Sequence, residues 1–358
     1  MDINTLHRIL DLARWAPSGD NTQPWRFVIP AASAAWQVEV HGFDTREHVL
    51  YDFHGHPSHL AHGALLETMR IAASAHGLSM AWELADANEE RAPVYRVRFI
   101  PDANLVTDPL FPFIEQRVVQ RRPMRTTPLR SEQRAAIIAA AGDAFDVQLF
   151  ESLPQCFGFA RMIWRNAHIR LTCPEAYPVH KEIIEWGARY SDDRIPEQAV
   201  GVDPLTAKLM RWVMQSWKRV DFFNRFLLGT VVPRIQLDFL PAIFCAAHLL
   251  IRTQRPLVTL ADWVNAGMVV QRVWLTVAQQ GLHLQPEMTP IIFRWYARAG
   301  EPFSRLPALG QAASRLAGEL ERLGQSSTSD SLVFLGRIGT CRSPRSRSRR
   351  LALDRLCS

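Results

Sequence analysis

The sequence predicts a protein of both helices and strands, built as two related halves. Apolar residues recur at helical spacing in several segments, and short alternating apolar runs between them are typical of strands. One long helical pattern also occurs twice, once in each half of the chain. A chain of 358 residues is long for one compact core, which favours two modules or one domain with insertions.

The first half begins with a helix that Asp2 can cap and whose apolar positions, from Leu6 to Ala13, lie on one face. We expect this helix to end before Pro17, because the residue preceding a proline is driven away from helical angles. Two strands are predicted at 25–28 and 36–40, then a long amphipathic helix over 57–77 and a further strand at 95–100.

The second half repeats this order. Ser131 can cap a helix that carries Ile137 and Ile138, and residues 145–150 (FDVQLF) read as a strand. Thr259 and Asp262 form a capping box for a helix that ends near residue 281.

The two long helices match without a gap over 62–78 (HGALLETMRIAASAHGL) and 266–282 (AGMVVQRVWLTVAQQGL), with glycines aligned at both ends. Any two amphipathic helices align somewhere, but these glycines favour a duplication. A glycine inside a helix costs about 1 kcal/mol against alanine. We therefore expect Gly63 and Gly267 to serve close backbone packing at a symmetric interface.

The formal charge of +6 is concentrated at one end of the chain. Seven arginines stand against Asp354 after Leu335, which accounts for the whole excess and leaves the remainder neutral. This distribution argues against a general nucleic-acid binder, which would spread basic residues over a face.

Cysteine usage and hydropathy predict a cytoplasmic location. The five cysteines are scattered and odd in number, which is typical of reduced thiols. Acidic and basic residues interrupt the N-terminal segment, so it does not resemble a signal peptide. The most apolar run, 239–251, is too short to span a membrane.

Residues 177–240 have no counterpart in the first half and are predicted to be a helical insertion rich in Trp, Phe and Arg. The insertion is a lid over a site or an ordinary helical pair packed on the core. A membrane-surface helix is a less favoured alternative, based on Lys208, Arg211, Lys218 and Arg219 among apolar residues.

The loop after the first helix, 14–25 (RWAPSGDNTQPW), combines small residues with two amides. Ser18 and Gly19 permit close backbone approach, and Asn21 and Gln23 offer the donors and acceptors that a flat heteroaromatic ring needs. The alternative, slightly favoured on chemistry alone, is a loop whose amides satisfy its own backbone.

Two arginine-rich segments are candidate phosphate sites. Residues 117–125 (RVVQRRPMR) hold Arg121, Arg122 and Arg125 within five positions, and guanidinium groups offer fixed forks of donors to phosphate. In the tail, alternation places Arg345, Arg347 and Arg349 on one face of a strand. The alternatives are a solvated basic surface and a disordered tail, although apolar segments bracket the tail arginines.

These segments together resemble the nitroreductase family of FMN-binding proteins. APSGDNTQPWRF resembles its Pro-Ser/Asn/Gln-Pro-Trp signature, QRRPMRTTPL its arginine-rich start, and the Arg-x-Arg tail its end. Residues 281–288 (GLHLQPEM) resemble the segment that lies over the flavin edge. Pro123 replaces the usual serine of the arginine motif, so one hydroxyl contact to phosphate is missing.

The order of the motifs departs from that family, whose FMN lies at a homodimer interface. The first half keeps the Pro17 loop and lacks the arginine motif, whereas the second half has the reverse. The resemblance therefore implies a pseudo-dimer with one complete FMN site and one abandoned site. It implies an α+β nitroreductase-like fold, each half a mixed sheet flanked by helices. The first half is 1–112, the second is 113–176 with 241–358, and the helical insertion is 177–240.

The resemblance also implies the FMN contacts. The phosphate is expected at Arg121, Arg122, Arg125, Arg347, Arg349 and Arg350; the ring at Pro17, Ser18, Gly19, Asn21 and Gln23; and its reactive edge at Pro286, Glu287 and Met288. No side chain is required as a catalytic acid or base. No metal site is expected, because Gly55 and Pro57 break the helical spacing of the histidines over 54–62.

The function expected from this resemblance is hydride transfer from NAD(P)H, through FMN, to an unidentified small-molecule electron acceptor. An FMN storage or sensor protein without turnover is the alternative, and an adaptor that uses the basic tail is a third. We expect a monomer with neither nucleic acid nor a membrane as partner.

Overall fold

The computed structural model describes residues 2–30, 36–86, 89–227 and 229–357, and it contains two four-stranded sheets with flanking helices. The first sheet has the order β1-β2-β4-β3, with β1 at Trp25–Val28, β2 at Gln37–Gly42, β3 at Leu78–Leu84 and β4 at Val94–Pro101. The second has the order β10-β11-β9-β5, with β5 at Asp146–Phe150, β9 at Ala247–Thr253, β10 at His283–Pro286 and β11 at Ser331–Gly339. The fold is α+β, as predicted.

The ladders of both sheets are antiparallel, and parallel pairing enters at isolated bridges. Phe27 pairs in parallel with Cys357, and Val119 pairs in parallel with Leu284. The first bridge joins the tail to the first sheet, and the second joins the segment that follows β4 to the second sheet. The segment that follows the last strand of each sheet therefore pairs with the other sheet.

Both halves have one topology. The first runs α1 (Ile3–Ala13), β1, β2, α2 (His56–Ser74), β3, β4. The second contains α3 (Ser131–Ala139), β5, β9, α11 (Leu260–Gln279), β10, β11 in the same sequence. Matching these elements in turn converts the order β1-β2-β4-β3 into β5-β9-β11-β10, which is the observed order of the second sheet. The repeat seen in two helices thus extends over both sheets.

Local sequence explains most of these elements. The Asp2 carboxylate accepts a hydrogen bond from the Thr5 amide at 2.7 Å and caps α1, and Thr259 with Asp262 forms the predicted capping box of α11. In β4 the alternating Tyr95, Val97 and Phe99 are buried. The expected cap at Ser131 is wrong by one position, because Ser131 is the first helical residue and the Arg130 amide is bound by the Gln133 side chain.

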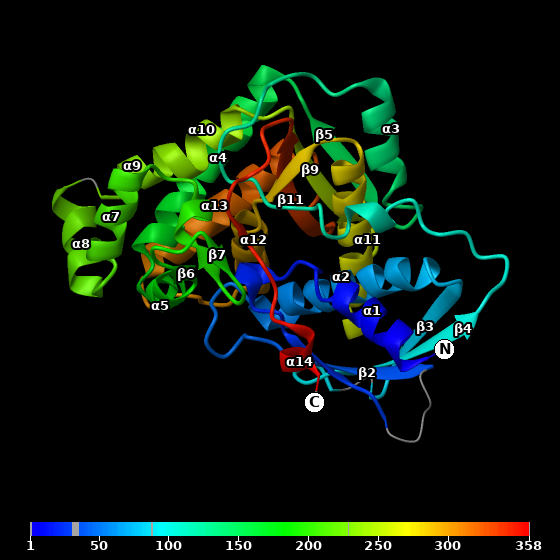
Figure 1. Cartoon of the computed structure of the whole chain (residues 1–358). Helices are drawn as coiled ribbons and strands as arrows, with labels where there is room; N and C mark the ends of the chain where they lie inside the picture. The colour runs from blue at the N-terminus through cyan, green and yellow to red at the C-terminus, as the bar shows by residue number, and fades with distance from the viewer. Residues whose placement is uncertain (1, 31–35, 87–88, 228, 358) are drawn as a thin grey trace.

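Helices α2 and α11 pack against each other between the two sheets (Figure 1). A Cβ atom on Gly63 would overlap the carbonyl oxygen of Val264, and a Cβ atom on Gly267 would overlap that of Leu60. The ungapped helix alignment pairs Gly63 with Gly267 and Leu60 with Val264, so the two contacts are reciprocal. Reciprocal contacts are the mark of a two-fold related interface, and the glycines perform the close packing expected of them.

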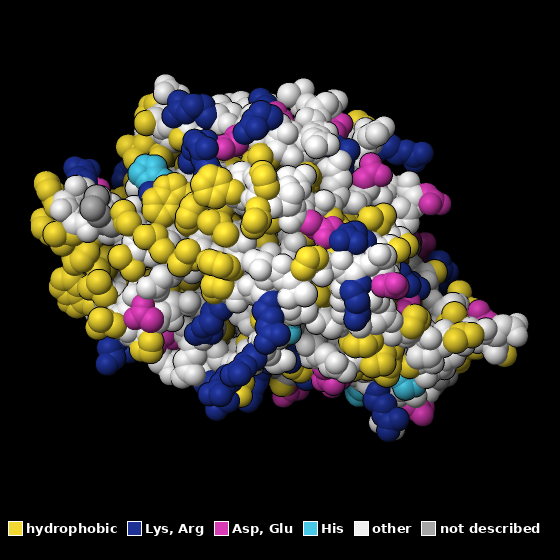
Figure 2. Space-filling view, turned by 90° about the horizontal axis from the view of Figure 1, so that it is seen from above, with side chains coloured by type: hydrophobic (Ala, Val, Ile, Leu, Met, Phe, Trp, Pro, Cys, Tyr) yellow, Lys and Arg dark blue, Asp and Glu magenta, His cyan; other side chains and the backbone are white. Residues whose placement is uncertain are grey.

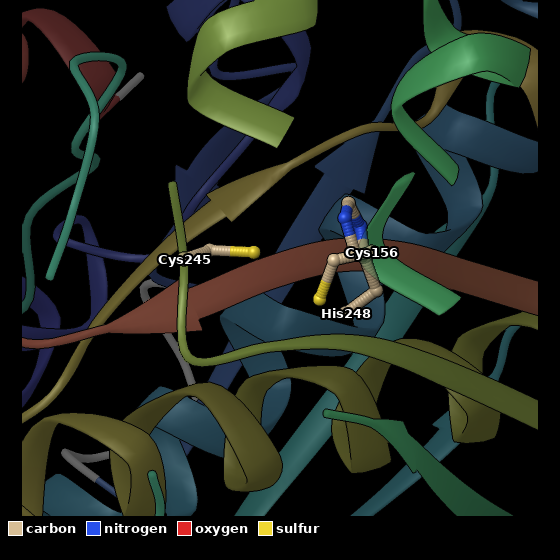
Figure 3. Close-up of side chains that lie close together, drawn as sticks. All are labelled: Cys156, Cys245 and His248. Carbon is tan, nitrogen blue, oxygen red and sulfur yellow. The ribbon is translucent and has the colours of Figure 1, made fainter. Parts of the chain in front are cut away.

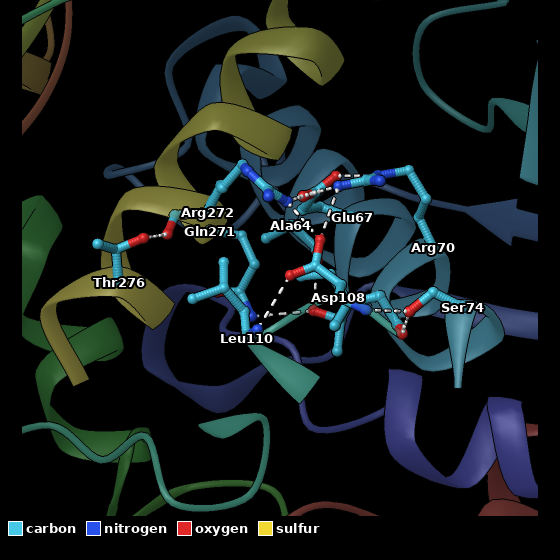
Figure 4. A network of polar contacts seen from close by, with 11 residues as sticks. Ala64, Glu67, Arg70, Ser74, Asp108, Leu110, Gln271, Arg272 and Thr276 are labelled. Carbon is cyan, nitrogen blue, oxygen red and sulfur yellow. Dashed lines mark hydrogen bonds and ion pairs between the residues drawn. The ribbon is translucent and has the colours of Figure 1, made fainter. Parts of the chain in front are cut away.

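Polar contacts across α2 and α11 follow the same reciprocity (Figure 4). Buried Glu67 accepts a bond from Arg272 at 2.9 Å, and Gln271 donates to Thr68 at 2.9 Å. The helix alignment makes Gln271 the counterpart of Glu67 and Arg272 the counterpart of Thr68. Asp108 accepts a second bond from Arg272 at 2.9 Å, which ties the segment after β4 to this interface.

The remaining helices cover the second half and form the insertion. The second sheet is flanked by α4 (Leu153–Thr172), α12 (Thr289–Ala299) and α13 (Pro307–Leu323). The insertion comprises α5 (Tyr177–Glu182), β6 (Ile184–Glu185), β7 (Tyr190–Ser191), β8 (Ile195–Pro196), α6 (Glu197–Val200), α7 (Pro204–Val213), α8 (Trp217–Phe226), α9 (Val231–Pro233), a π-helical turn (Arg234–Phe239) and α10 (Leu240–Ile243).

The helices of the insertion are individually too short or too polar to span a membrane. Across the described residues, no one helix is long and apolar enough to cross a bilayer. Helix α8 and the stretch Val231–Ile243 have the length and composition of a membrane span only when they are taken together, and their axes are bent by 84° relative to each other.

The carboxy-terminal tail returns to the first half of the molecule. It forms β12 (Arg347–Ser348), which pairs in parallel with β7 of the insertion, and α14 (Leu353–Leu356). Leu351 and Leu356 are buried in the core of the first half. The apolar stretch at 351–353 that follows the tail arginines thus leads into a short helix and anchors the tail on the first half.

Candidate functional site

A cavity of about 650 Å³ lies where the two halves, the insertion and the tail meet. This volume lies within the range of roughly 300–1,000 Å³ that small-molecule sites occupy. The predicted residues that line it are Pro17, Ser18, Gly19, Asn21, Arg121, Pro286, Glu287, Met288, Arg347 and Arg350. Segments far apart in the sequence thus form one chamber.

The loop that forms one wall has a strained backbone. Asp20, Asn21 and Gln23 have φ values of 50°, 68° and 49°, in the left-handed region that residues other than glycine rarely adopt. Each such residue costs on the order of 1–3 kcal/mol and persists only where its surroundings hold it. Here the Ser18 Oγ accepts a bond from the Gln23 amide at 2.9 Å and closes the turn.

The two amides of this loop have different roles. Gln23 is fully buried; its Nε2 donates to the Asp192 carbonyl at 2.8 Å and its Oε1 accepts from the Leu351 amide at 2.9 Å. Gln23 thus joins loop, insertion and tail and does not line the cavity. Asn21 also donates to the Asp192 carbonyl, at 3.1 Å, but its buried Oδ1 has no partner and remains available to a ligand.

Three arginines gather at one end of the cavity and bond only backbone carbonyls. Arg117 donates to the Trp15 carbonyl at 2.7 Å, Arg350 to that of Ala16 at 3.0 Å, and Arg347 to that of Glu115 at 2.9 Å. Within the described ranges, none of the three forms an ion pair with a carboxylate. We call Arg117, Arg347 and Arg350 the arginine cluster.

The electrostatics of the arginine cluster are those of a site that can hold an anion. Burial, together with the charges of Arg350 and Arg347, holds the pKa of Arg117 well below its usual value, and burial with Arg347 nearby lowers the pKa of Arg350 to about 9. The Nε groups of Arg117 and Arg347 and the indole N–H of Trp15 are buried without acceptors. Buried donors are almost always paired, so these three donors and the uncompensated charge call for an anion with several oxygens.

The middle of the cavity is polar but balanced in charge. Arg121 lines it near Asp20, and burial raises the pKa of Asp20 although the charges of Arg121 and Arg170 oppose this. Arg170 pairs with Asp238 at 3.0 Å, and the Tyr51 hydroxyl lies 2.8 Å from the His180 Nε2. The cations here lie beside carboxylates, whereas in the arginine cluster only Arg347 has a carboxylate, that of Glu115, close enough to influence its pKa.

Three predicted phosphate contacts do not line the cavity. Arg122 and Arg125 are exposed on the surface, and exposed Arg349 lies over the Tyr190 ring at 4.4 Å. The prediction that Arg349 shares one strand face with Arg347 is wrong, because β12 ends at Ser348. The alternation that directs Arg347 inward therefore ends before Arg349. Arg350 lies at the cavity in its place.

A buried polar group lies behind the wall formed by Pro286, Glu287 and Met288. The Glu287 carboxylate lies 3.0 Å from the His248 Nδ1, while the His248 Nε2 lies 2.9 Å from the Ala242 carbonyl. Burial opposes protonation of this ring, but the Glu287 carboxylate outweighs it and the pKa of His248 is raised.

Cys156 and Cys245 lie beside His248, with the three potential ligand atoms within 4.8 Å of one another (Figure 3). Because both ring nitrogens of His248 already face acceptors, the ring offers no free lone pair to a metal. The trio therefore fits a hydrogen-bonded polar group and not a metal centre.

Sequence reasoning missed several residues of the site. Arg117 stands at the start of the predicted arginine segment, but the family resemblance begins only at Gln120, so nothing singled it out. Trp15 lies in the 14–25 loop but was given no role there, and Tyr51 lies in no predicted motif. Most of the apolar wall comes from the insertion, including Met210, Met214 and Phe223, whose place over the cavity depends on tertiary packing.

Comparison with known proteins gives one curated relative and several solved structures; no family model matches. The relative is an uncharacterized protein of Mycobacterium tuberculosis (strain CDC 1551 / Oshkosh), 25% identical over 321 residues that cover 86% of this chain and 41% of the relative. The chain thus spans about two fifths of the length of that relative.

The solved structures share low sequence identity with this chain. A nitroreductase with bound FMN from Desulfitobacterium hafniense DCB-2 is 11% identical, with a TM-score of 0.38 over 69% of this chain and 96% of that one. The chain is similar to FMN-binding nitroreductases. Iodotyrosine deiodinase bound to FMN and 3-iodo-L-tyrosine is 11% identical, with a TM-score of 0.37 over 68% of this chain and 95% of that one. The nitroreductase NfnB of Mycobacterium smegmatis in complex with NADPH is 12% identical, with a TM-score of 0.36 over 68% of this chain and 94% of that one.

Proposed function

We propose that this chain is an FMN-binding oxidoreductase of nitroreductase type. The observation that carries the proposal is the arginine cluster at one end of a cavity of about 650 Å³, whose members form no ion pair with a described carboxylate and in which the buried Nε groups of Arg117 and Arg347 have no acceptor. A phosphate monoester offers the charge and the oxygens that this cluster lacks. The rest of the cavity, bounded by the Pro17 loop and by 286–288, has room for a flat ring system.

The residues that would hold FMN differ in part from the sequence expectation. Arg117, Arg347 and Arg350 would bind the phosphate, with the hydroxyls of Ser346 and Ser348 also lining that end. The Asn21 Oδ1 would accept a hydrogen bond from the ring. Bound FMN supplies reversible hydride transfer, while the protein supplies position and electrostatics.

The electron donor in this proposal is NAD(P)H, and the acceptor is a small molecule that enters the same cavity. The side chains over the cavity from α7 and α8, such as Met210, Val213 and Phe223, would exclude water from the reacting face.

The same cover favours a second candidate function, FMN storage or sensing without turnover. A cavity roofed by the insertion leaves little free room for a nicotinamide once a flavin is bound, unless α7 and α8 move. The two functions differ in one observable property, which is whether a bound flavin can be reduced by a pyridine nucleotide.

One experiment tests both functions. The protein is purified, its visible absorption spectrum is recorded, and NADH or NADPH is added without oxygen. Flavin bands that bleach support the oxidoreductase, and bands that persist with either nucleotide but bleach with dithionite support storage or sensing. Arg122→Ala, on the surface, serves as the matched control for Arg117→Ala: the first should purify yellow and the second largely colourless. Wild-type protein that neither carries FMN nor takes it up would contradict both.

A further inference from the structure

The far end of the insertion exposes a cluster of large apolar side chains on α7 and α8. Figure 2 shows this end as a hydrophobic surface with basic side chains at its edges. The residues, which we call the apolar tip, are Leu205, Leu209, Trp212, Phe222, Phe226 and Leu227. Phe226 is 70% exposed and Leu205 is 77% exposed. Soluble monomers rarely gather such residues without a partner.

The apolar tip is continuous and preformed. Leu205, Leu209 and Trp212 follow helical spacing along one side of α7. The Trp212 ring contacts Phe223 at 5.8 Å between centroids, and Phe222 contacts Phe226 at 5.2 Å, so the aromatic rings join the two helices. The tip is therefore a structural feature of the helix pair, not a set of isolated exposed residues.

The charges on these two helices are predominantly positive. Lys208, Arg211, Lys218 and Arg219 form no ion pair within the described residues, whereas Arg225 pairs with Asp221 at 2.9 Å. An aromatic and aliphatic surface bordered by unpaired cations has the composition of helices that lie in the headgroup region of anionic bilayers. A second copy of the chain would instead bring like charges together around its own tip.

We propose that the apolar tip docks this protein on anionic membrane surfaces, with Trp212, Phe222 and Phe226 entering the boundary between headgroups and acyl chains. This proposal is the alternative to the sequence-based expectation that the chain has no membrane partner. The docking does not depend on FMN, because Trp212, Phe222 and Phe226 do not line the cavity.

The cavity gives the docking a consequence for ligand entry. Leu209 and Leu227 belong to the exposed tip and also line the cavity, so the apolar surface continues from one into the other. An apolar ligand dissolved in the lipid could enter between α7 and α8 without crossing water.

Vesicle flotation tests the docking with the full chain. Phosphatidylcholine vesicles with and without phosphatidylglycerol are mixed with wild type, Phe226→Glu and the control Val258→Glu, whose side chain is 76% exposed and does not belong to the insertion. We expect wild type and V258E to float with the anionic vesicles and F226E to stay in solution. Lys208→Gln and Lys218→Gln should each weaken binding roughly fivefold, and added salt should weaken it further.

Three results would overturn the proposal: wild type that stays in solution, equal flotation of F226E and V258E, or equal binding to vesicles without phosphatidylglycerol. Circular dichroism checks that each variant is folded. Sedimentation measures self-association. If the wild type self-associates, F226E does not, and neither binds vesicles, the tip binds a second copy of the chain and the proposal is wrong.

Discussion

The partner that an arginine side chain finds decides its role in this molecule. Half-buried Arg170 meets a carboxylate and is neutralised, whereas the hydrogen bonds of Arg117 and Arg350 go only to backbone carbonyls and leave their charges without an ion pair. Sequence spacing selected Arg122 and Arg125 because they lie close together along the chain, yet both are exposed. Spacing identifies a basic segment but does not show which of its side chains face inward.

The first prediction follows from this difference. Arg117→Ala and Arg350→Ala should each weaken FMN binding about ten- to a hundredfold and riboflavin binding far less, because a bond to a charged group contributes about 1.5–3 kcal/mol. Arg122→Ala and Arg125→Ala are the controls and should change neither affinity. Titration calorimetry on the apoprotein measures all four variants. If R122A lost as much FMN affinity as R117A, the phosphate would lie elsewhere.

At the scale of elements, local sequence predicted those features that local sequence controls. Helix α1, strand β1 and the capping box of α11 follow from caps and periodicity within a few residues. The end of the tail strand could not be predicted in this way, because the end of β12 is set by its pairing with β7 of the insertion. The insertion was predicted as helical, but its small strands β6 and β8 pair only with each other, and their two-residue lengths leave no pattern in the sequence.

The packing of α2 on α11 gives a second prediction. Gly63→Ala should lower the free energy of unfolding by about 1–3 kcal/mol, because the added methyl would overlap the Val264 carbonyl. Gly318→Ala in α13 is the matched control; no atom lies within 4 Å of its added Cβ, and it should raise stability by about 0.5–1 kcal/mol. Urea unfolding compares the two variants. Equal effects of the two substitutions would mean that the α2–α11 contact does not constrain the backbone.

The buried histidines of α2 make stability depend on pH. Burial lowers the pKa of both His59 and His62 to about 4, below the value of about 6.5 for an unfolded chain. Between these values the unfolded state binds more protons, so the folded state loses stability as the pH falls from 7 towards 4. The loss approaches about 1.4 kcal/mol per pH unit for each histidine.

Urea midpoints at pH 7 and pH 5 measure this dependence. His62→Gln should show a smaller drop between the two pH values than wild type. His7→Gln, at an exposed position of α1, should keep the full drop. A drop of the same size in wild type and H62Q would assign the acid sensitivity to other groups.

At the scale of the whole molecule, two halves of one topology form the chamber from one loop of the first half and from the arginine-bearing segments of the second half and tail. The sequence showed the repeat in two helices and divided the motifs between the halves. It could not show that the tail crosses back to bury Leu351 and Leu356 in the first half, because such crossing depends on contacts between residues hundreds of positions apart. The asymmetry of the halves implies one ligand site per chain.

The ratio of bound FMN to protein tests this account most directly. Flavin released from the purified, FMN-saturated protein by denaturation is quantified by its absorbance and divided by the chain concentration from amino-acid analysis. The account predicts a ratio near one, since the described residues hold one arginine cluster, at the cavity that the Pro17 loop also lines, for the two halves. A ratio near two would show that both halves keep a site, and a ratio near zero after saturation would show that the arginine cluster binds another anion.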